Sequence, residues 1–171
     1  MALILGFQRQ AANVSDSELT RFHSWTKVTD MPYPMSPQSA VLCIQPTASQ
    51  LRARSSPIRV DAGPHQDYYV DVWVNDKGLK AMTDLGVFPA GSVIVKEKLR
   101  GKGSREAELS TVMIKREKGF NPACGDWEFA TLDGTGKKVT SRGKLSTCMG
   151  CHQRQAIRDY VFRPYISGTS K

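Results

Sequence analysis

The sequence predicts a single α+β domain that consists mostly of an antiparallel β-sheet with a few short helices. The chain has 171 residues, which suits one ordinary domain with a hydrophobic core of its own. Several apolar runs alternate with a period of two, as half-buried strands do, and they do not alternate with helices as a parallel sheet would require. Glycines separate several of these runs, which favours hairpins between neighbouring strands.

The N-terminal third of the chain predicts little regular structure. Polar residues 13–17 can cap a short helix. The apolar side of that helix would be formed by Leu19, Phe22 and Trp25. Residues 31–37 contain three prolines and are expected to be irregular. Residues 40–44 (AVLCI) predict a short buried strand, and residues 45–64 predict a long surface loop.

The rest of the chain predicts the sheet. Residues 68–75 (YYVDVWVN) alternate strongly and predict a strand. Asn75 or Asp76 can then cap a helix over residues 77–84, which Gly86 would end. Further strands are predicted over residues 91–99, 108–116 and 126–132, and a last short one from Val139.

Residues 148–152, Cys-Met-Gly-Cys-His, form the C-x-x-C-H signature of covalent c-type haem attachment. The two thiols, one helical turn apart, can form thioethers with the two vinyl groups of one haem. The adjacent His152 can then bind the iron as proximal ligand. The sequence therefore predicts one haem c, attached through Cys148 and Cys151, on a helix that runs through Arg158.

Half of a zinc site and a dithiol redox pair are the alternatives for this motif. The remaining cysteines and histidines are Cys43, Cys124, His23 and His65. They do not form a second closely spaced pair of ligands, which a zinc site would need. The motif also follows no βαβ pattern, which a dithiol redox pair would need. Cys43 and Cys124 could form a disulfide in an oxidising compartment. His23 or His65 could be a second axial ligand, whereas no Met follows His152 in the chain.

The composition gives a net charge of +8, from 24 basic and 16 acidic residues. This charge suits an acidic redox partner, an anionic membrane surface or nucleic acid. The basic residues are scattered, and their densest run, residues 96–105, contains no aromatic residue, which disfavours nucleic acid. No apolar run has the length of a transmembrane helix.

The N-terminal residues 1–13 are expected to be either a disordered terminus or the remnant of an export signal, followed by a haem domain over residues 14–171. The first seven residues, MALILGF, are apolar but too short for the core of a signal peptide. Because bacteria attach haem to C-x-x-C-H outside the cytoplasm, a periplasmic location is expected.

Three stretches give the chain a resemblance to a known family: FPAGSVIVKEKL at residues 88–99, NPACGDWEFATL at 121–132 and CMGCHQRQAIRDYVF at 148–162. From about Thr20 to Ile166 the chain resembles the cytochrome P-460 family, whose relatives are the cytochromes c′-beta. The resemblance implies a curved antiparallel sheet with a few helices, usually in a homodimer.

The resemblance also implies roles for single residues. Cys148 and Cys151 match the haem-bonding cysteines, and His152 matches the proximal ligand. Lys96 matches the lysine that is cross-linked to the porphyrin edge in cytochromes P-460. Thr111 stands where well-known members carry an acidic residue in the distal pocket, and a hydroxyl cannot accept a proton near neutral pH as a carboxylate can.

Aromatic residues and one arginine complete the candidate site. The aromatic residues that could form the wall of the haem pocket, or simply fill the core, are Trp127, Phe129, Tyr160 and Phe162. Arg163 could pair with a haem propionate, although a surface position is the expectation for an arginine.

The function expected from the motif and the resemblance is that of a mono-haem c-type cytochrome with five-coordinate iron. It would oxidise hydroxylamine through NO-level intermediates and pass electrons to a redox protein. One alternative is a protein that binds NO for capture or sensing, as in cytochromes c′-beta, and another is a plain periplasmic electron carrier. Lys96 favours the enzyme, whereas Thr111 favours NO binding.

Overall fold

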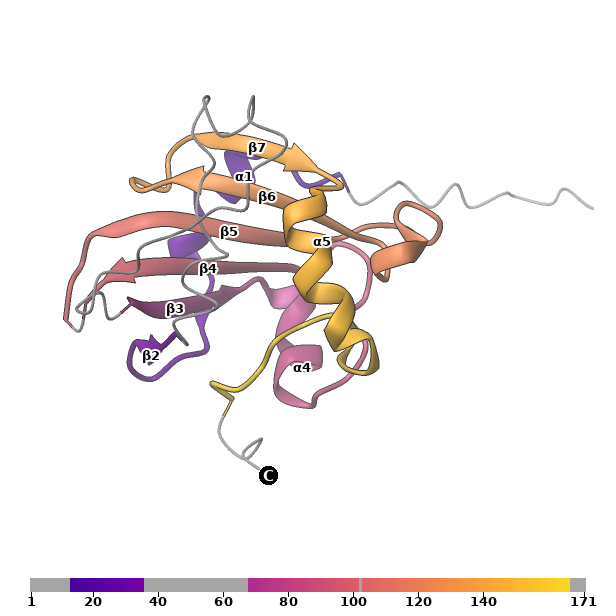
Figure 1. Cartoon of the computed structure of the whole chain (residues 1–171), viewed down its shortest axis with the longest axis horizontal. Helices are drawn as coiled ribbons and strands as arrows, with labels where there is room; N and C mark the ends of the chain where they lie inside the picture. The colour runs from indigo at the N-terminus through magenta and orange to yellow at the C-terminus, as the bar shows by residue number, and fades with distance from the viewer. Residues whose placement is uncertain (1–12, 36–67, 102, 167–171) are drawn as a thin grey trace, which may run out of the picture.

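A seven-stranded antiparallel sheet forms the body of the protein (Figure 1). The computed structural model describes residues 13–35, 68–101 and 103–166. The strands are β1 (Thr26–Lys27), β2 (Tyr33–Pro34), β3 (Tyr68–Val74), β4 (Val93–Arg100), β5 (Ala107–Lys115), β6 (Trp127–Asp133) and β7 (Val139–Gly143). Their order is β1-β3-β4-β5-β6-β7, and β2 also pairs with β3. The predicted fold class, an α+β domain dominated by antiparallel strands, is confirmed.

Short helices connect and cover these strands. They are α1 (Asp16–Leu19), the 3-10 helix η1 (Phe22–Ser24), α4 (Asp76–Thr83), the 3-10 helix η2 (Pro122–Cys124), α5 (Ser146–His152) and the 3-10 helix η3 (Gln153–Arg158). The side chains of Ser15 and Asn75 accept hydrogen bonds from the first turns of α1 and α4, as N-caps do. None of the described helices is long and apolar enough to cross a membrane.

Two local predictions were wrong. The helix expected to run through Arg158 is α-helical only to His152 and continues as η3, which is kinked at Gln155. It ends where the backbone turns left-handed at Asp159. Tyr33–Pro34, expected to be irregular, pairs instead with β3. The predictions for residues 40–44 and 45–64 lie outside the described residues, as do Cys43 and His65.

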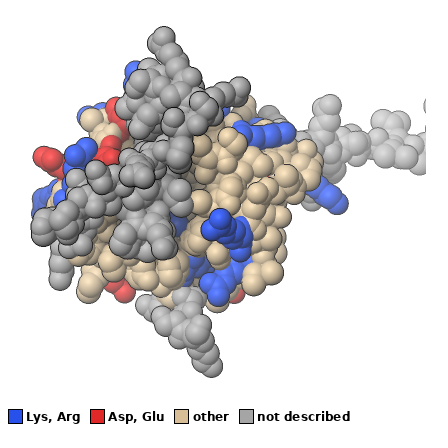
Figure 2. All heavy atoms as spheres, in the orientation of Figure 1, with Lys and Arg blue, Asp and Glu red and all other residues tan. Residues whose placement is uncertain are grey.

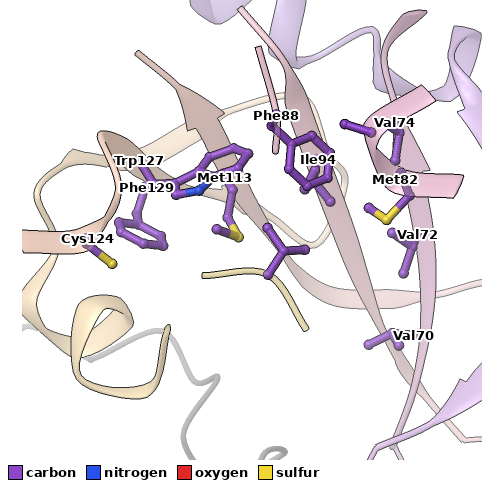
Figure 3. Close-up of a cluster of buried hydrophobic side chains, with 12 residues drawn as sticks. Val70, Val72, Val74, Met82, Phe88, Ile94, Met113, Cys124, Trp127 and Phe129 are labelled. Carbon is purple, nitrogen blue, oxygen red and sulfur yellow. The ribbon is translucent and has the colours of Figure 1, made fainter. Parts of the chain in front are cut away.

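Apolar side chains cover both faces of the sheet. The α1 face packs against α1 and η1 through residues that include Leu19, Phe22, Val93, Val95, Val112, Ile114, Ala130 and Leu132. The opposite face, here called the α5 face, carries Val70, Val72, Val74, Ile94, Met113, Trp127 and Phe129 (Figure 3). In Figure 1, α5 crosses the strands in front of this face. The α5 face is therefore the one on which the C-x-x-C-H motif lies.

Strand register fixes which polar side chains share the α5 face. Lys96 on β4 is paired with Val72 on β3 and with Thr111 on β5. Thr111 is paired in turn with Thr131 on β6. Because directly opposed residues in a sheet point to the same side, Lys96 and Thr111 both belong to the α5 face.

Candidate haem-binding site

The two motif cysteines lie on α5 at a spacing of three residues, so their side chains leave the same side of the helix. Both are partly buried and neither is in a disulfide. Cys148 packs against the apolar cluster of the α5 face, together with Leu145 and Met149. Neither α5 nor η3 contains a fully buried residue. The helix that carries the thiols therefore lies on the surface of the sheet core without being buried in it.

His152, the last residue of α5, is held in one tautomer. Its Nδ1 lies 2.7 Å from the carbonyl oxygen of Tyr160. A carbonyl can only accept, so Nδ1 carries the hydrogen and donates it, which leaves the lone pair on Nε2. Burial, and second the positive charge of Lys96, lower the His152 pKa to about 4, against the opposing effect of the Tyr160 carbonyl. The imidazole is therefore neutral near pH 7 and has the form that binds a metal.

Two of the four predicted aromatic residues lie beside His152. The rings of Phe129 and Phe162 each have their centroid 5.2 Å from that of the imidazole. Trp127 is completely buried and donates its indole N–H to the carbonyl of Asp159 at 2.8 Å. Tyr160 provides the carbonyl that accepts from His152. The described structure thus brings Phe129 and Phe162 to the imidazole and places Trp127 in the core beneath the turn that follows η3.

Lys96 reaches the same group of aromatic rings. Its Nζ lies 5.5 Å from the Phe162 ring centroid and 5.1 Å from that of Tyr165. It also donates a weak hydrogen bond of 3.4 Å to the Phe162 carbonyl. The side chain is half-buried. Strand alternation alone could not predict this burial, since the neighbours of Lys96 on its face of β4 include polar residues. Phe162 contacts both the Lys96 amine and the His152 imidazole.

Two features of the α5 face were not predicted from the sequence. The Tyr165 hydroxyl is buried and has no hydrogen-bond partner among the described residues, and burial raises its pKa. Lys98 is buried, with its Nζ 3.2 Å from Glu108 and 4.0 Å from the ring centroid of Tyr68. The pairing of β4 with β5 shifts register between Lys98 and Leu99, next to Glu108, and no local pattern in the sequence indicates this shift.

Arg163 is buried, and the prediction of a surface position was wrong. Its guanidinium donates to the carbonyls of Ala81 at 3.0 Å, Gly86 at 2.9 Å and Arg158 at 3.2 Å. It also lies 4.7 Å above the ring centroid of Phe88. Arg163 therefore ties the C-terminal end of α4 to the end of η3. These acceptors are backbone groups distant in sequence, so no residue pattern could reveal them.

His23 belongs to a different part of the molecule. Its Nε2 lies 2.9 Å from Glu97, and its ring packs edge-on against Trp73 at 5.1 Å. Trp73 packs against the cluster of the α1 face, so the structure places His23 on the side of the sheet away from His152. Its suggested role as a second axial ligand is therefore wrong.

Cys124 is a fully buried free thiol, and burial raises its pKa to about 11. The described residues contain no group of three or more His, Cys, Asp or Glu side chains arranged to hold a metal ion, which the zinc alternative would need. The suggested partner of Cys124, Cys43, is not among the described residues.

The donor set of the α5 face fits a haem. It offers two thiols one helical turn apart that are in no disulfide, a neutral imidazole with its lone pair on Nε2, and flat aromatic rings beside it. The unpaired Tyr165 hydroxyl is a further polar group that a ligand could satisfy. Fold and site together define a haem protein built on an antiparallel sheet.

The comparison with known families agrees with this class. A family model described as Cytochrome P460 matches residues 50–163, which is about two-thirds of the chain. The chain therefore belongs to the cytochrome P460 family, and it is a haem cytochrome. A search of curated proteins found no match.

Proposed function

We propose that this cytochrome carries one haem c and oxidises hydroxylamine. When bound, the haem supplies an iron that can coordinate a small nitrogen ligand and accept its electrons. Cys148 and Cys151 would hold the haem through thioethers. Among the described residues, His152 would be the one that binds the iron, and the substrate would bind the same iron.

The observation that carries this proposal is the position of Lys96. Its Nζ lies 5.5 Å from the centroid of the Phe162 ring. The centroid of the His152 imidazole lies 5.2 Å from the same centroid. A macrocycle bound by His152 would therefore have its edge within reach of this lysine. A bond from the Lys96 nitrogen to a carbon of that edge replaces one N–H and one C–H bond, so its formation releases two protons and two electrons and needs an external oxidant such as O2 or peroxide. Once formed, it would distort the ring and alter the electronics of the iron. A plain electron carrier has no need of such a bond.

A second candidate function, the binding of NO, is favoured by Thr111. This residue faces Lys96 directly across β4 and β5, and it offers only a hydroxyl. The nearby carboxylate on β5, Glu108, is engaged by Lys98 at 3.2 Å. Oxidation of hydroxylamine releases protons and needs an acceptor for them, whereas binding of NO does not. The two functions therefore differ in whether the α5 face can provide a base.

The experiment compares the mature haem protein with Lys96→Leu. Peptide mapping by mass spectrometry should find haem on the fragment that contains Lys96, as well as on the one that contains Cys148. Lys96→Leu should keep its thioether-bound haem, regain an ordinary haem c spectrum and lose hydroxylamine oxidation with an artificial electron acceptor. Lys144→Leu, which changes an exposed lysine next to α5, is the matched control and should behave as the wild type.

If the fragment with Lys96 carries no haem and the wild-type spectrum is ordinary, the hydroxylamine proposal fails. Titration of the reduced protein with NO then tests the second function. Saturation at one NO per haem without turnover of hydroxylamine would support NO capture.

The charge distribution supports an acidic electron acceptor as partner. Residues 134–171 contain eight Lys and Arg residues, and Asp159 is their single acidic residue. Arg154 and Arg158 on η3 are exposed close to the C-x-x-C-H motif. In Figure 2, the right half of the view, where α5 lies in Figure 1, shows several blue Lys and Arg side chains and few red Asp and Glu side chains. Export to the periplasm and a homodimeric state belong to the same proposal and await fractionation and sizing experiments.

A further inference from the structure

The backbone after η3 makes an unusual turn that includes Tyr160, the residue whose carbonyl holds His152. Asp159 has φ +51° and Tyr160 has φ +63°, so two consecutive non-glycine residues are left-handed. This conformation is unfavourable for residues with a Cβ atom. The surrounding contacts must therefore hold the turn in place.

Three hydrogen-bonded contacts converge on Asp159. One carboxylate oxygen lies 2.7 Å from the Lys115 amine of β5, and the other accepts the backbone N–H of Phe88 at 2.8 Å. The Asp159 carbonyl accepts the indole N–H of Trp127 on β6 at 2.8 Å. Only 9% of the Asp159 side chain and 11% of the Lys115 side chain are exposed, so this ion pair is largely shielded from water. The turn is thereby fixed to the end of the sheet.

The next residue, Tyr160, connects this fixed turn to the imidazole of His152. The carbonyl of Tyr160 accepts the Nδ1 hydrogen of His152 at 2.7 Å. The Tyr160 ring lies directly over Gly125, where an added Cβ would come within 2.5 Å of it. The carbonyl thus has little freedom to move away from His152 while the Lys115–Asp159 pair is intact.

We propose that Asp159 and Lys115 are positioning residues that aim the Tyr160 carbonyl at His152 and so set how strongly the imidazole donates electrons to iron. The hydrogen bond from the second ring nitrogen of a ligating histidine fixes its orientation and raises its basicity. This inference rests on the proposed role of His152 as proximal ligand. The pair acts through the backbone and touches neither haem nor substrate.

The test is resonance Raman spectroscopy of the reduced haem protein, with redox titration of the same samples. In Lys115→Met and Asp159→Asn, the iron–histidine stretching band should move to lower frequency and broaden. The midpoint potential should become more positive, because a less basic imidazole stabilises ferric iron less. Lys115→Arg keeps the charge and should restore the wild-type band.

Glu128→Gln is the matched control. Glu128 forms a similarly buried ion pair with Arg116, and its side chain is also 9% exposed. It is on β6 next to Trp127, so its side chain points to the opposite face of the sheet. The control should lower thermal stability without moving the iron–histidine band or the potential. If the Lys115–Asp159 pair had a merely structural role, Lys115→Met and Asp159→Asn would behave as Glu128→Gln does: they would lose thermal stability and leave the band and the potential unchanged.

An unchanged band and potential in folded Lys115→Met and Asp159→Asn would overturn the inference. If either variant does not fold, Trp127→Phe removes the N–H that holds the Asp159 carbonyl, together with part of a buried ring system, and should give a smaller shift in the same direction. An unchanged band there would also overturn it. A wild-type protein with no iron–histidine band would refute a five-coordinate ferrous iron bound by His152, which is a failure of the proposed function and is recognised without any variant.

Discussion

Replacement of Gly125 by alanine should destabilise the protein through a defined steric contact. Gly125 has φ +60°, and an added Cβ would lie 2.5 and 2.6 Å from two ring carbons of Tyr160. Real Cβ atoms do not approach so closely, and an aromatic ring packed on the core cannot simply rotate away. The added methyl group should therefore cost about 1–3 kcal/mol from overpacking. The left-handed backbone should cost about a further 1–2 kcal/mol.

Gly119→Ala separates these two costs. Gly119 also has a positive φ, +97°, but an added Cβ there meets no atom within 4 Å. Its φ is farther from the left-handed minimum near +57°, so its backbone cost is no smaller than that at Gly125. The assay is urea unfolding followed by circular dichroism, with both variants measured under the conditions used for the wild type. Gly125→Ala should lose about 1–3 kcal/mol more than Gly119→Ala.

An equal loss in the two glycine variants would refute the contact between Gly125 and Tyr160. It would also weaken the view that the Tyr160 ring is held in place from that side. The linear dependence of the unfolding free energy on urea should keep the same slope in both variants, because the surface exposed on unfolding is nearly unchanged.

Three further predictions follow from the site. Cys148→Ala and Cys151→Ala should each keep one of the two thioethers and retain haem less fully, whereas the double variant should release its haem to acidic solvent; haem that stays bound to the double variant in mass spectrometry would contradict the motif. The ferric protein should be largely high-spin by electron paramagnetic resonance, because His152 is the only strong-field ligand proposed, and a low-spin signal across neutral pH would reveal another. Arg163→Met should cost about 2–4 kcal/mol in unfolding free energy, since it leaves three backbone carbonyls, one of them in a buried hydrogen bond, without their charged donor. Arg158→Met, at an exposed position, should cost less than about 0.5 kcal/mol.

The strands and the helix α4 were predictable because their signals are local. Residues 68–75 alternate strictly, and the structure has β3 over Tyr68–Val74. The helix expected over residues 77–84 is α4, Asp76–Thr83, with Asn75 as its cap. In each case the signals are local: the spacing of the apolar residues, the capping residue and the residue that ends the element lie within a few residues of one another.

The parts that escaped prediction depend on groups distant in sequence. The burial of Arg163 depends on carbonyls contributed by α4 and η3. The left-handed turn at Asp159 depends on Lys115, which is 44 residues away. The half-burial of Lys96 involves the rings of Phe162 and Tyr165, and Phe162 is 66 residues away. The conformational propensity of each of these residues gives no sign of these contacts.

The order of the strands bears on how this protein matures. From β3 to β7 each strand pairs with the next one in the chain, so the larger part of the sheet consists of short-range contacts, which form readily. The segment with both thiols and His152 comes after this sheet, and it contributes no fully buried side chain from α5 or η3. In the apoprotein its amides should exchange with solvent faster than those of β4 and β5, and haem attachment should slow them. With the haem attached as proposed above, α5 and η3 would be fixed last, against a sheet that has already formed.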